Sequence, residues 1–195
     1  MWLPSDRQEK ILNAIPKEHQ PIFWWCKLHF RRPGEACALH KTDFKDNIFT
    51  IQRTFSNRIL TDSTKTGEIH QIECVDDFKP FLKRMPKTLS PFFFVNPYAR
   101  KAGKHYSLKT MEDIWKRACN EVVEHITLYA GLKHSSCCQY LNEKGGSFSE
   151  LQSVTDHKRM ESVERYGELQ IKRRKELMER KVIRLDRNKT GNTPK

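Results

Sequence analysis

The stretch His29–Leu39, with the sequence HFRRPGEACAL, contains the features that decide how the chain folds around it. Pro33 has a fixed φ angle and no amide proton to satisfy, so it suits the first turn of a helix. Glu35 then lies in that first turn, where a negative charge is favourable. These residues predict a turn that ends one helix, places Arg32 at the start of the next and offers an anion site there.

Helical and extended patterns alternate in blocks on both sides of this turn. Apolar residues recur at helical spacing before it, at about 5–16 and 18–30. After it, β-branched and aromatic runs indicate three strands, at 48–51, 58–61 and 68–75. The later helical patterns lie at about 76–86, 107–124, 132–143, 148–155, 158–166 and 168–185. This order predicts an α+β, mainly helical domain with a small antiparallel three-stranded sheet.

A second informative segment lies far along the chain. It begins with Leu132-Lys133-His134-Ser135 and continues through Asp156-His157 to Val163-Glu164-Arg165-Tyr166. Between the two segments, Thr64-Lys65-Thr66-Gly67 has the composition of a turn between strands. Taken in order, these segments resemble the catalytic-domain boxes of the tyrosine recombinase (phage integrase) family. The resemblance runs from about Leu3 to Arg173.

The resemblance implies the tyrosine-recombinase catalytic fold and catalytic roles for five residues. Arg32 corresponds to the first phosphate-binding arginine, Lys65 to the hairpin lysine and Tyr166 to the nucleophile. His157 corresponds to the family's histidine or tryptophan, and Lys133 stands where the family has its second arginine. The resemblance also implies that no metal ion, nucleotide or other cofactor is required, because the protein's own cations neutralise the phosphate.

These residue types suit the cutting and rejoining of DNA. Attack by a phenolate on a phosphodiester adds negative charge to the non-bridging oxygens, and guanidinium groups stabilise that charge. Tyr166 would form a 3′-phosphotyrosyl bond, Lys65 would protonate the departing 5′-oxygen and His157 would hydrogen-bond the phosphate. We therefore expect a site-specific recombinase or integrase of mobile-element type that acts on double-stranded DNA.

The chain departs from the family pattern just before its His-Ser pair. Where the family has His-x-x-Arg, this sequence has Ala130-Gly131-Leu132-Lys133. Lys133 keeps a positive charge but lacks the planar guanidinium fork, and the side chain of Ala130 donates no hydrogen bond. Because the loss of one transition-state donor costs ~3 kcal/mol, we expect a slow enzyme. The alternative is a catalytically weakened or inactive DNA-binding remnant of an integrase.

The distribution of charge agrees with a polyanionic partner. The chain has 195 residues and a net charge of +12, and half of that excess lies between Gly167 and Lys195. Our candidate DNA-binding residues are Lys172, Arg173, Arg174 and Lys175. We expect residues 1–173 to form the catalytic domain, and residues 174–195 to form the end of a basic helix and a disordered tail. This helix either packs on a neighbouring subunit, giving a homo-oligomer on DNA, or folds back on its own domain.

Other features bear on location and metal binding. No apolar run is long enough to cross a membrane, so we expect a soluble cytoplasmic protein of bacterial or phage type, associated with the nucleoid.

The six irregularly spaced cysteines predict reduced thiols. The pairs Cys26/His29 and Cys37/His40 have zinc-like spacing, but their helical positions favour core packing. The family usually has a separate N-terminal DNA-gripping domain, whereas this sequence starts at the catalytic domain, so either the sequence is a piece of a longer protein or the protein lacks that domain.

Overall fold

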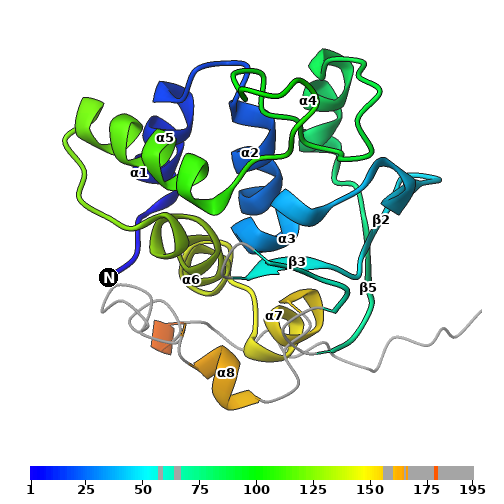
Figure 1. The fold of residues 1–195 in the computed structure, drawn as a ribbon. Coiled ribbons are helices and arrows are strands. Elements are labelled where there is room, and N and C mark those ends of the chain that lie inside the picture. Colours follow the sequence, from blue (N-terminus) through cyan, green and yellow to red (C-terminus); the bar gives the residue numbers. More distant parts are fainter. Residues whose placement is uncertain (57–58, 64–66, 156–159, 165, 167–177, 180–195) are drawn as a thin grey trace, which may run out of the picture.

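The computed structural model describes residues 1–56, 59–63, 67–155, 160–164, 166 and 178–179 (Figure 1). Its α-helices are α1 (Ser5–Ala14), α2 (Gln20–Leu28), α3 (Pro33–Ala38), α4 (Lys79–Arg84), α5 (Leu108–Glu121), α6 (Ser135–Asn142), α7 (Phe148–Thr155) and α8 (Met160–Glu164). Its strands are β1 (Phe44–Lys45), β2 (Ile48–Ile51), β3 (Thr54–Ser56), β4 (Ile59–Thr61) and β5 (His70–Glu73). Two 3₁₀ turns, η1 (Lys41–Asp43) and η2 (Asp76–Phe78), and one π-helical turn, η3 (Ala130–His134), connect them.

The predicted α+β, mainly helical architecture with a small antiparallel three-stranded sheet is confirmed, although one strand differs from the prediction. The three-stranded sheet has the order β1-β2-β5, with Phe49 opposite both Phe44 and Ile72. The predicted strand that ends at Thr61 is not part of it, because β4 pairs with β3 in a separate two-stranded ribbon. Two strands, β1 and β3, were not predicted from the sequence. They are only two and three residues long, too short to give a recognisable run of strand-forming residues.

Helix α2 occupies the middle of the main core (Figure 1). It contacts α1 on one side and α3 at its C-terminal end, and α5 packs across α1. Trp25 of α2 is fully buried and lies edge-on to Phe49, with ring centroids 5.6 Å apart. Burial of such large aromatic side chains supplies most of the hydrophobic stabilisation that holds helices and sheet together. None of the described helices is both long and apolar enough to cross a membrane.

A second, smaller apolar cluster lies beneath the main core and joins α6, α7 and α8. Its buried members are Cys137, Cys138, Leu141, Leu151, Val163 and Tyr166. Because Val163 and Tyr166 pack against Cys137, Cys138 and Leu141 of α6 in this cluster, it anchors the segment that carries Tyr166 to α6. The relative position of α6 and α3 therefore determines which residues can lie near the Tyr166 phenol.

Two glycines permit the close approaches on which the site depends. A Cβ atom on Gly34 in α3 would lie 2.6 Å from the carbonyl oxygen of Phe55, so only glycine lets the β3–β4 ribbon reach α3. A Cβ atom on Gly131 in η3 would lie 2.2 Å from the Trp115 ring of α5. Each glycine thus brings a further element to within contact distance of the turn that carries Arg32 or Lys133.

Candidate active site

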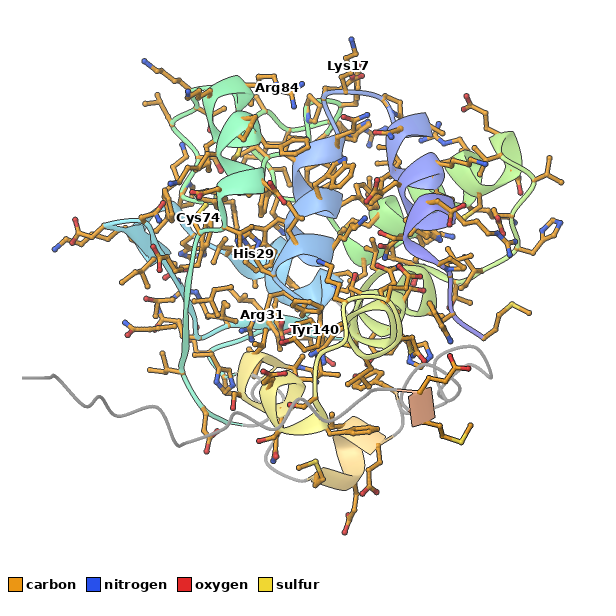
Figure 2. The ribbon with its side chains drawn as sticks, turned by 180° about the vertical axis from the view of Figure 1, so that it is seen from behind. Lys17, His29, Arg31, Cys74, Arg84 and Tyr140 are labelled. Carbon is orange, nitrogen blue, oxygen red and sulfur yellow. The ribbon has the colours of Figure 1, made fainter. Side chains whose placement is uncertain are left out.

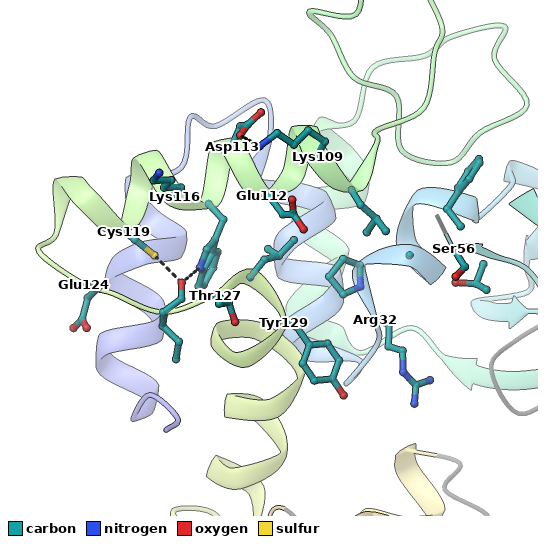
Figure 3. A pocket seen from close by; sticks show the side chains of 18 of the residues that line it. Arg32, Ser56, Lys109, Glu112, Asp113, Lys116, Cys119, Glu124, Thr127 and Tyr129 are labelled. Atoms are coloured by element: carbon teal, nitrogen blue, oxygen red, sulfur yellow. Dashed lines mark hydrogen bonds and ion pairs between the residues drawn. The ribbon is translucent and has the colours of Figure 1, made fainter. Parts of the chain in front are cut away.

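Arg32 is held at the start of α3 by the residue that follows it by three positions. The Arg32 amide donates to Oε2 of Glu35 at 2.9 Å, and its Nη1 donates to Oε1 at 2.8 Å. Glu35 is 3% exposed, whereas the Arg32 side chain keeps 23% of its surface accessible. One edge of the guanidinium is therefore fixed on the protein, and the exposed remainder projects outward beside Tyr129 (Figure 3).

Arg31, the neighbouring arginine, points elsewhere. It follows Phe30, whose φ of 55° is in the left-handed region that non-glycine residues rarely adopt. Arg31 is 2% exposed, and its Nη2 donates to the carbonyl oxygen of Val154 in α7 at 3.1 Å (Figure 2). The sharp turn thus directs two adjacent cations to different partners, and Arg31 links the start of α3 to α7. No role for Arg31 was predicted from the sequence.

Lys133 lies in η3 and is fully buried. Its Nζ atom has no hydrogen-bond partner among the residues that the structure describes. Burial and the positive charge of Arg32 lower the pKa of Lys133 to about 8, and the negative charge of Glu35 partly opposes this shift. An unpartnered buried ammonium is costly, so this atom is well suited to receive an anion.

The irregular backbone of η3 has its own support. The Nε2 atom of Gln8, a fully buried side chain of α1, donates to the carbonyl oxygens of Gly131 at 2.7 Å and Leu132 at 3.2 Å. The hydroxyl of Ser135 donates to the carbonyl oxygen of Ala130 at 2.6 Å. π-Helical turns often lie at functional sites, and here side chains satisfy the carbonyl groups around the turn that carries Lys133.

Tyr166 is 5% exposed and lies in the second apolar cluster. Its ring is 5.3 Å from the ring of His134. Burial raises the pKa of Tyr166 well above its ordinary value, with further contributions from Cys137 and Tyr129, while the charge of Arg32 opposes the rise. The phenol is therefore protonated at neutral pH and lies within electrostatic reach of Arg32.

Glu35 is the negative centre of this group of cations. Burial favours its neutral form, but the charges of Lys133 and Arg32 and the hydrogen bonds from Arg32 hold the pKa of Glu35 below its ordinary value. The described part of the site consequently combines one carboxylate with Arg31, Arg32 and Lys133. This imbalance of charge favours the binding of an anion between Arg32 and Lys133.

A groove of about 1060 Å³ opens beside Arg32 (Figure 3). It runs between α5, the β3–β4 ribbon and residues 125–129, and Arg32 and Tyr129 line the same end. Two of its carboxylates are already paired, because Asp113 contacts Lys109 at 2.9 Å and Glu124 contacts Arg7 at 2.5 Å. The groove therefore carries less negative charge than its composition indicates, and its Arg32 end is cationic.

The structure brings three of the five predicted catalytic residues together: Arg32, Lys133 and Tyr166. Lys65 and His157 lie outside the described residues. So do the predicted DNA-binding residues Lys172, Arg173, Arg174 and Lys175, and the predicted segment 174–195 except for residues 178–179.

Tyr129, which lines the groove with Arg32, and the interaction of Glu35 with Lys133 were not predicted from the sequence. The signal for Tyr129 was its place immediately before Ala130, the position at which the family's histidine is missing.

Of the two cysteine–histidine pairs, Cys26, His29 and Cys37 are buried and His40 is half-buried. Cys26 and Cys37 are fully buried, and burial raises the pKa of each thiol above its ordinary value. His29 contacts the carbonyl oxygen of Trp25 through Nδ1 at 3.1 Å and accepts from the Val75 amide through Nε2 at 3.3 Å. Within the described ranges, no group of His, Cys, Asp or Glu side chains has the geometry of a metal site.

No protein-family model matches the sequence, and no curated protein sequence matches it. Among solved structures, the Tn1549 transposon integrase in complex with a circular intermediate DNA has a TM-score of 0.71 at 15% identity, over 93% of this chain and 66% of that one. A lambda integrase dimer bound to a core site has a TM-score of 0.66 at 17% identity, over 85% of this chain and 47% of that one. The catalytic domain of bacteriophage HP1 integrase has a TM-score of 0.59 at 16% identity, over 85% of this chain and 86% of that one.

These similarities establish the fold. The chain has the catalytic fold of tyrosine recombinases, with the small antiparallel sheet and the surrounding helices in the same arrangement. It spans 66% of the Tn1549 integrase chain and 47% of the lambda integrase chain, and most of the length of the HP1 catalytic domain.

Proposed function

We propose that this chain is a tyrosine-recombinase catalytic domain that cuts and rejoins double-stranded DNA through a 3′-phosphotyrosyl intermediate. The observation that carries the proposal is the meeting of Arg32, Lys133 and Tyr166 in one cationic site. These residues come from three separate segments of the chain, and they meet within a fold shared with integrases whose solved structures contain DNA. A merely basic surface would not require a buried lysine and a buried phenol that both lie within electrostatic reach of Arg32.

The scissile phosphate would bind between Arg32 and Lys133. Arg32 presents the free edge of a guanidinium whose other edge is fixed by Glu35, so little side-chain entropy is lost on binding. Lys133 contributes the buried ammonium group that lacks a partner among the described residues. A phosphate there would raise the pKa of Lys133 from about 8 and keep it charged.

Tyr166 would attack the phosphorus, and the bond to the 5′-oxygen would break. Its hydroxyl would transfer its proton as the new O–P bond forms, because burial disfavours the free phenolate. In this proposal Lys65 protonates the departing 5′-oxygen, and His157 donates a hydrogen bond to the phosphate. In the same proposal, Lys172, Arg173, Arg174 and Lys175 would contact the DNA backbone, and the segment that contains them would join subunits on DNA.

Covalent trapping tests this proposal without knowledge of the target site. The full 195-residue chain is incubated with a pool of duplexes of randomised sequence that carry nicks and 5′-bridging phosphorothiolate linkages. Wild-type protein is expected to form complexes that survive denaturation, and Tyr166→Phe is expected to form none. Tyr140→Phe is the matched control, because Tyr140 lies in α6 and packs beside the same apolar cluster.

The same assay separates a working enzyme from a DNA-binding remnant. The buried Lys133 and the missing donor at Ala130 are the specific features that favour a weakened site. A remnant would retain salt-sensitive binding to DNA but would give no covalent complex with any member of the pool. A wild-type chain that neither binds DNA nor forms the complex would refute both forms of the proposal.

A further inference from the structure

We infer that Gln8 is a positioning residue for Lys133, because its side chain holds the π-helical turn η3 in the shape that directs the Lys133 ammonium toward the phosphate. The inference rests on the proposed function and adds to it a residue to which the family resemblance assigns no role. Gln8 is fully buried, so it acts on the DNA only through the backbone that carries Lys133.

The two phosphate-binding cations of the proposed site are held in different ways. Glu35 fixes Arg32 at its head, because Oε1 of Glu35 accepts a hydrogen bond from Nη1 of the guanidinium at 2.8 Å. Lys133 lacks such an anchor, since its buried Nζ has no hydrogen-bond partner among the residues that the structure describes. The position of the ammonium is therefore set by its backbone in η3 and by the side chains packed around it.

Gln8 contacts that backbone directly. Nε2 of Gln8 donates to the carbonyl oxygen of Gly131 at 2.7 Å and to that of Leu132 at 3.2 Å. Gly131 and Leu132 are the two residues that precede Lys133, and they lie in a π-helical turn that departs from regular α-helical bonding. Because Gln8 is fully buried, solvent does not compete for these hydrogen bonds.

A buried polar network fixes Gln8 itself. Nε2 of Gln139 in α6 donates to Oε1 of Gln8 at 3.2 Å and to the carbonyl oxygen of Leu3 at 2.8 Å. The Leu3 amide donates to Oγ of Ser135 at 2.9 Å, and that hydroxyl donates to the carbonyl oxygen of Ala130 at 2.6 Å. Two chains of hydrogen bonds thus link the segment that enters α1, beside α6 in Figure 1, to the carbonyl groups of η3.

Gln8 occupies a position on α1 that packing alone would give to an apolar residue. It lies one turn from the fully buried Ile11 and Leu12, on the same face of the helix. Burial of an amide side chain is unfavourable unless its hydrogen bonds are satisfied. Both ends of the Gln8 amide are satisfied here, and its amino group serves the carbonyl groups next to Lys133.

The opposite side of η3 is closed by an apolar contact. A Cβ atom on Gly131 would lie 2.2 Å from the Trp115 ring of α5, so the ring limits how far the turn can move in that direction. Such a contact does not orient carbonyl groups, whereas a hydrogen bond is directional. The orientation of the turn before Lys133 therefore depends on Gln8.

A double-mutant cycle tests whether Gln8 acts through Lys133. Gln8→Met removes the amide and keeps a side chain of similar length, and we expect it to slow covalent-complex formation at saturating DNA about 100-fold, as for a misplacement of about 1 Å. Lys133→Met is expected to slow it about 100- to 1000-fold. Added to Lys133→Met, Gln8→Met should slow it less than about threefold further, because the group that it positions is already absent.

A substrate with a neutral linkage gives a readout that a general loss of structure would not change. In a methylphosphonate duplex, a methyl group replaces one non-bridging oxygen of the scissile linkage and removes its negative charge, so the charge of Lys133 contributes less. We expect the defect of Gln8→Met to shrink from about 100-fold to less than about tenfold on this substrate. Gln20→Met is the matched control, because Gln20 donates to the carbonyl oxygen of Ile15 at 2.9 Å, outside the candidate site, and it should behave as wild type on both substrates.

Urea unfolding establishes that each variant is folded under the assay conditions. Should Gln8→Met fail to fold, Gln8→Glu replaces it in the same cycle at pH 6, since a neutral buried carboxylic acid keeps one donor for η3. Wild-type rates for the Gln8 variant, effects of Gln8 and Lys133 that multiply, or an equal defect on both substrates would each overturn the inference and leave the proposed function intact. Absence of a covalent complex with wild type would overturn the proposed cleavage and this inference with it.

Discussion

Replacing Lys133 by Met is expected to stabilise the folded protein at neutral pH while removing a phosphate contact. The lysine side chain is fully buried, and its Nζ has no hydrogen-bond partner within the described part of the chain. Methionine has a similar length and flexibility and carries no charge, so it fills the same space. The pKa of Lys133 falls from 10.5 to about 8 on burial. At about 1.4 kcal/mol per pH unit, retaining the charge costs ~3 kcal/mol.

The pH dependence gives this prediction its sign. Because the folded-state pKa of Lys133 is lower than its unfolded value, the unfolded chain binds more protons between about pH 8 and 10.5. The stability of wild type therefore rises with pH across this window. The methionine variant lacks this rise, so its advantage of ~1–3 kcal/mol at pH 6.5 should disappear as the pH approaches 10.5.

Urea unfolding of both proteins at pH 6.5 and pH 10 measures this difference. Lys10→Met is the matched control, because Lys10 is an exposed residue of α1, and it should change the free energy of unfolding by less than about 0.5 kcal/mol at either pH. The reasoning is refuted by a methionine variant that is less stable than wild type at pH 6.5. A stability difference that stays constant between the two pH values refutes it equally.

The remaining predictions concern the same region of the fold. Glu35→Gln leaves the surrounding buried cations without their counter-charge and should lower the free energy of unfolding by ~3 kcal/mol, measured by urea unfolding; a loss below 1 kcal/mol contradicts the buried ion pair. Gly131→Ala forces a methyl group against Trp115 and should cost ~1–3 kcal/mol and shift tryptophan fluorescence, whereas an unchanged spectrum and stability would show that η3 has room to move. Ala130→His combined with Lys133→Arg should raise the single-turnover rate of covalent-complex formation ~100-fold, since it restores two donors; an unchanged rate would indicate a site that already works in its present form.

Local structure followed closely from local chemistry. Pro33 was expected to open a helix, and α3 begins there, with Glu35 bonded to the Arg32 amide as its first-turn position favours. The stretch 148–155 was predicted helical and forms α7 with those bounds. The predicted helix at 107–124 forms α5, shorter by a few residues, with the side chain of Ser107 accepting from the Thr110 amide. Such features depend on neighbours a few residues away, so the sequence contains the necessary information.

Strand pairing was less predictable. The run that ends at Thr61 has the residue types of a strand, and it does form β4. Its partner, however, is the short β3 and not β2, because Gly34 allows β3 to approach α3 and the ribbon separates from the main sheet. Residue types indicate that a segment is extended, whereas the choice of partner depends on which distant elements can approach it.

The sequence alone determined that this chain contains an arginine turn, a lysine-containing segment and then Tyr166, in an order that resembles one family. It did not determine that Lys133 is buried without a described partner, or that Arg31 donates to the carbonyl oxygen of Val154 while Arg32 pairs with Glu35. Those properties arise from contacts between segments distant in sequence, and a residue's burial, pKa and hydrogen-bond partners are set by what surrounds it in space. The order of residues specified which groups are available, and tertiary packing decided which of them meet and in what state of charge.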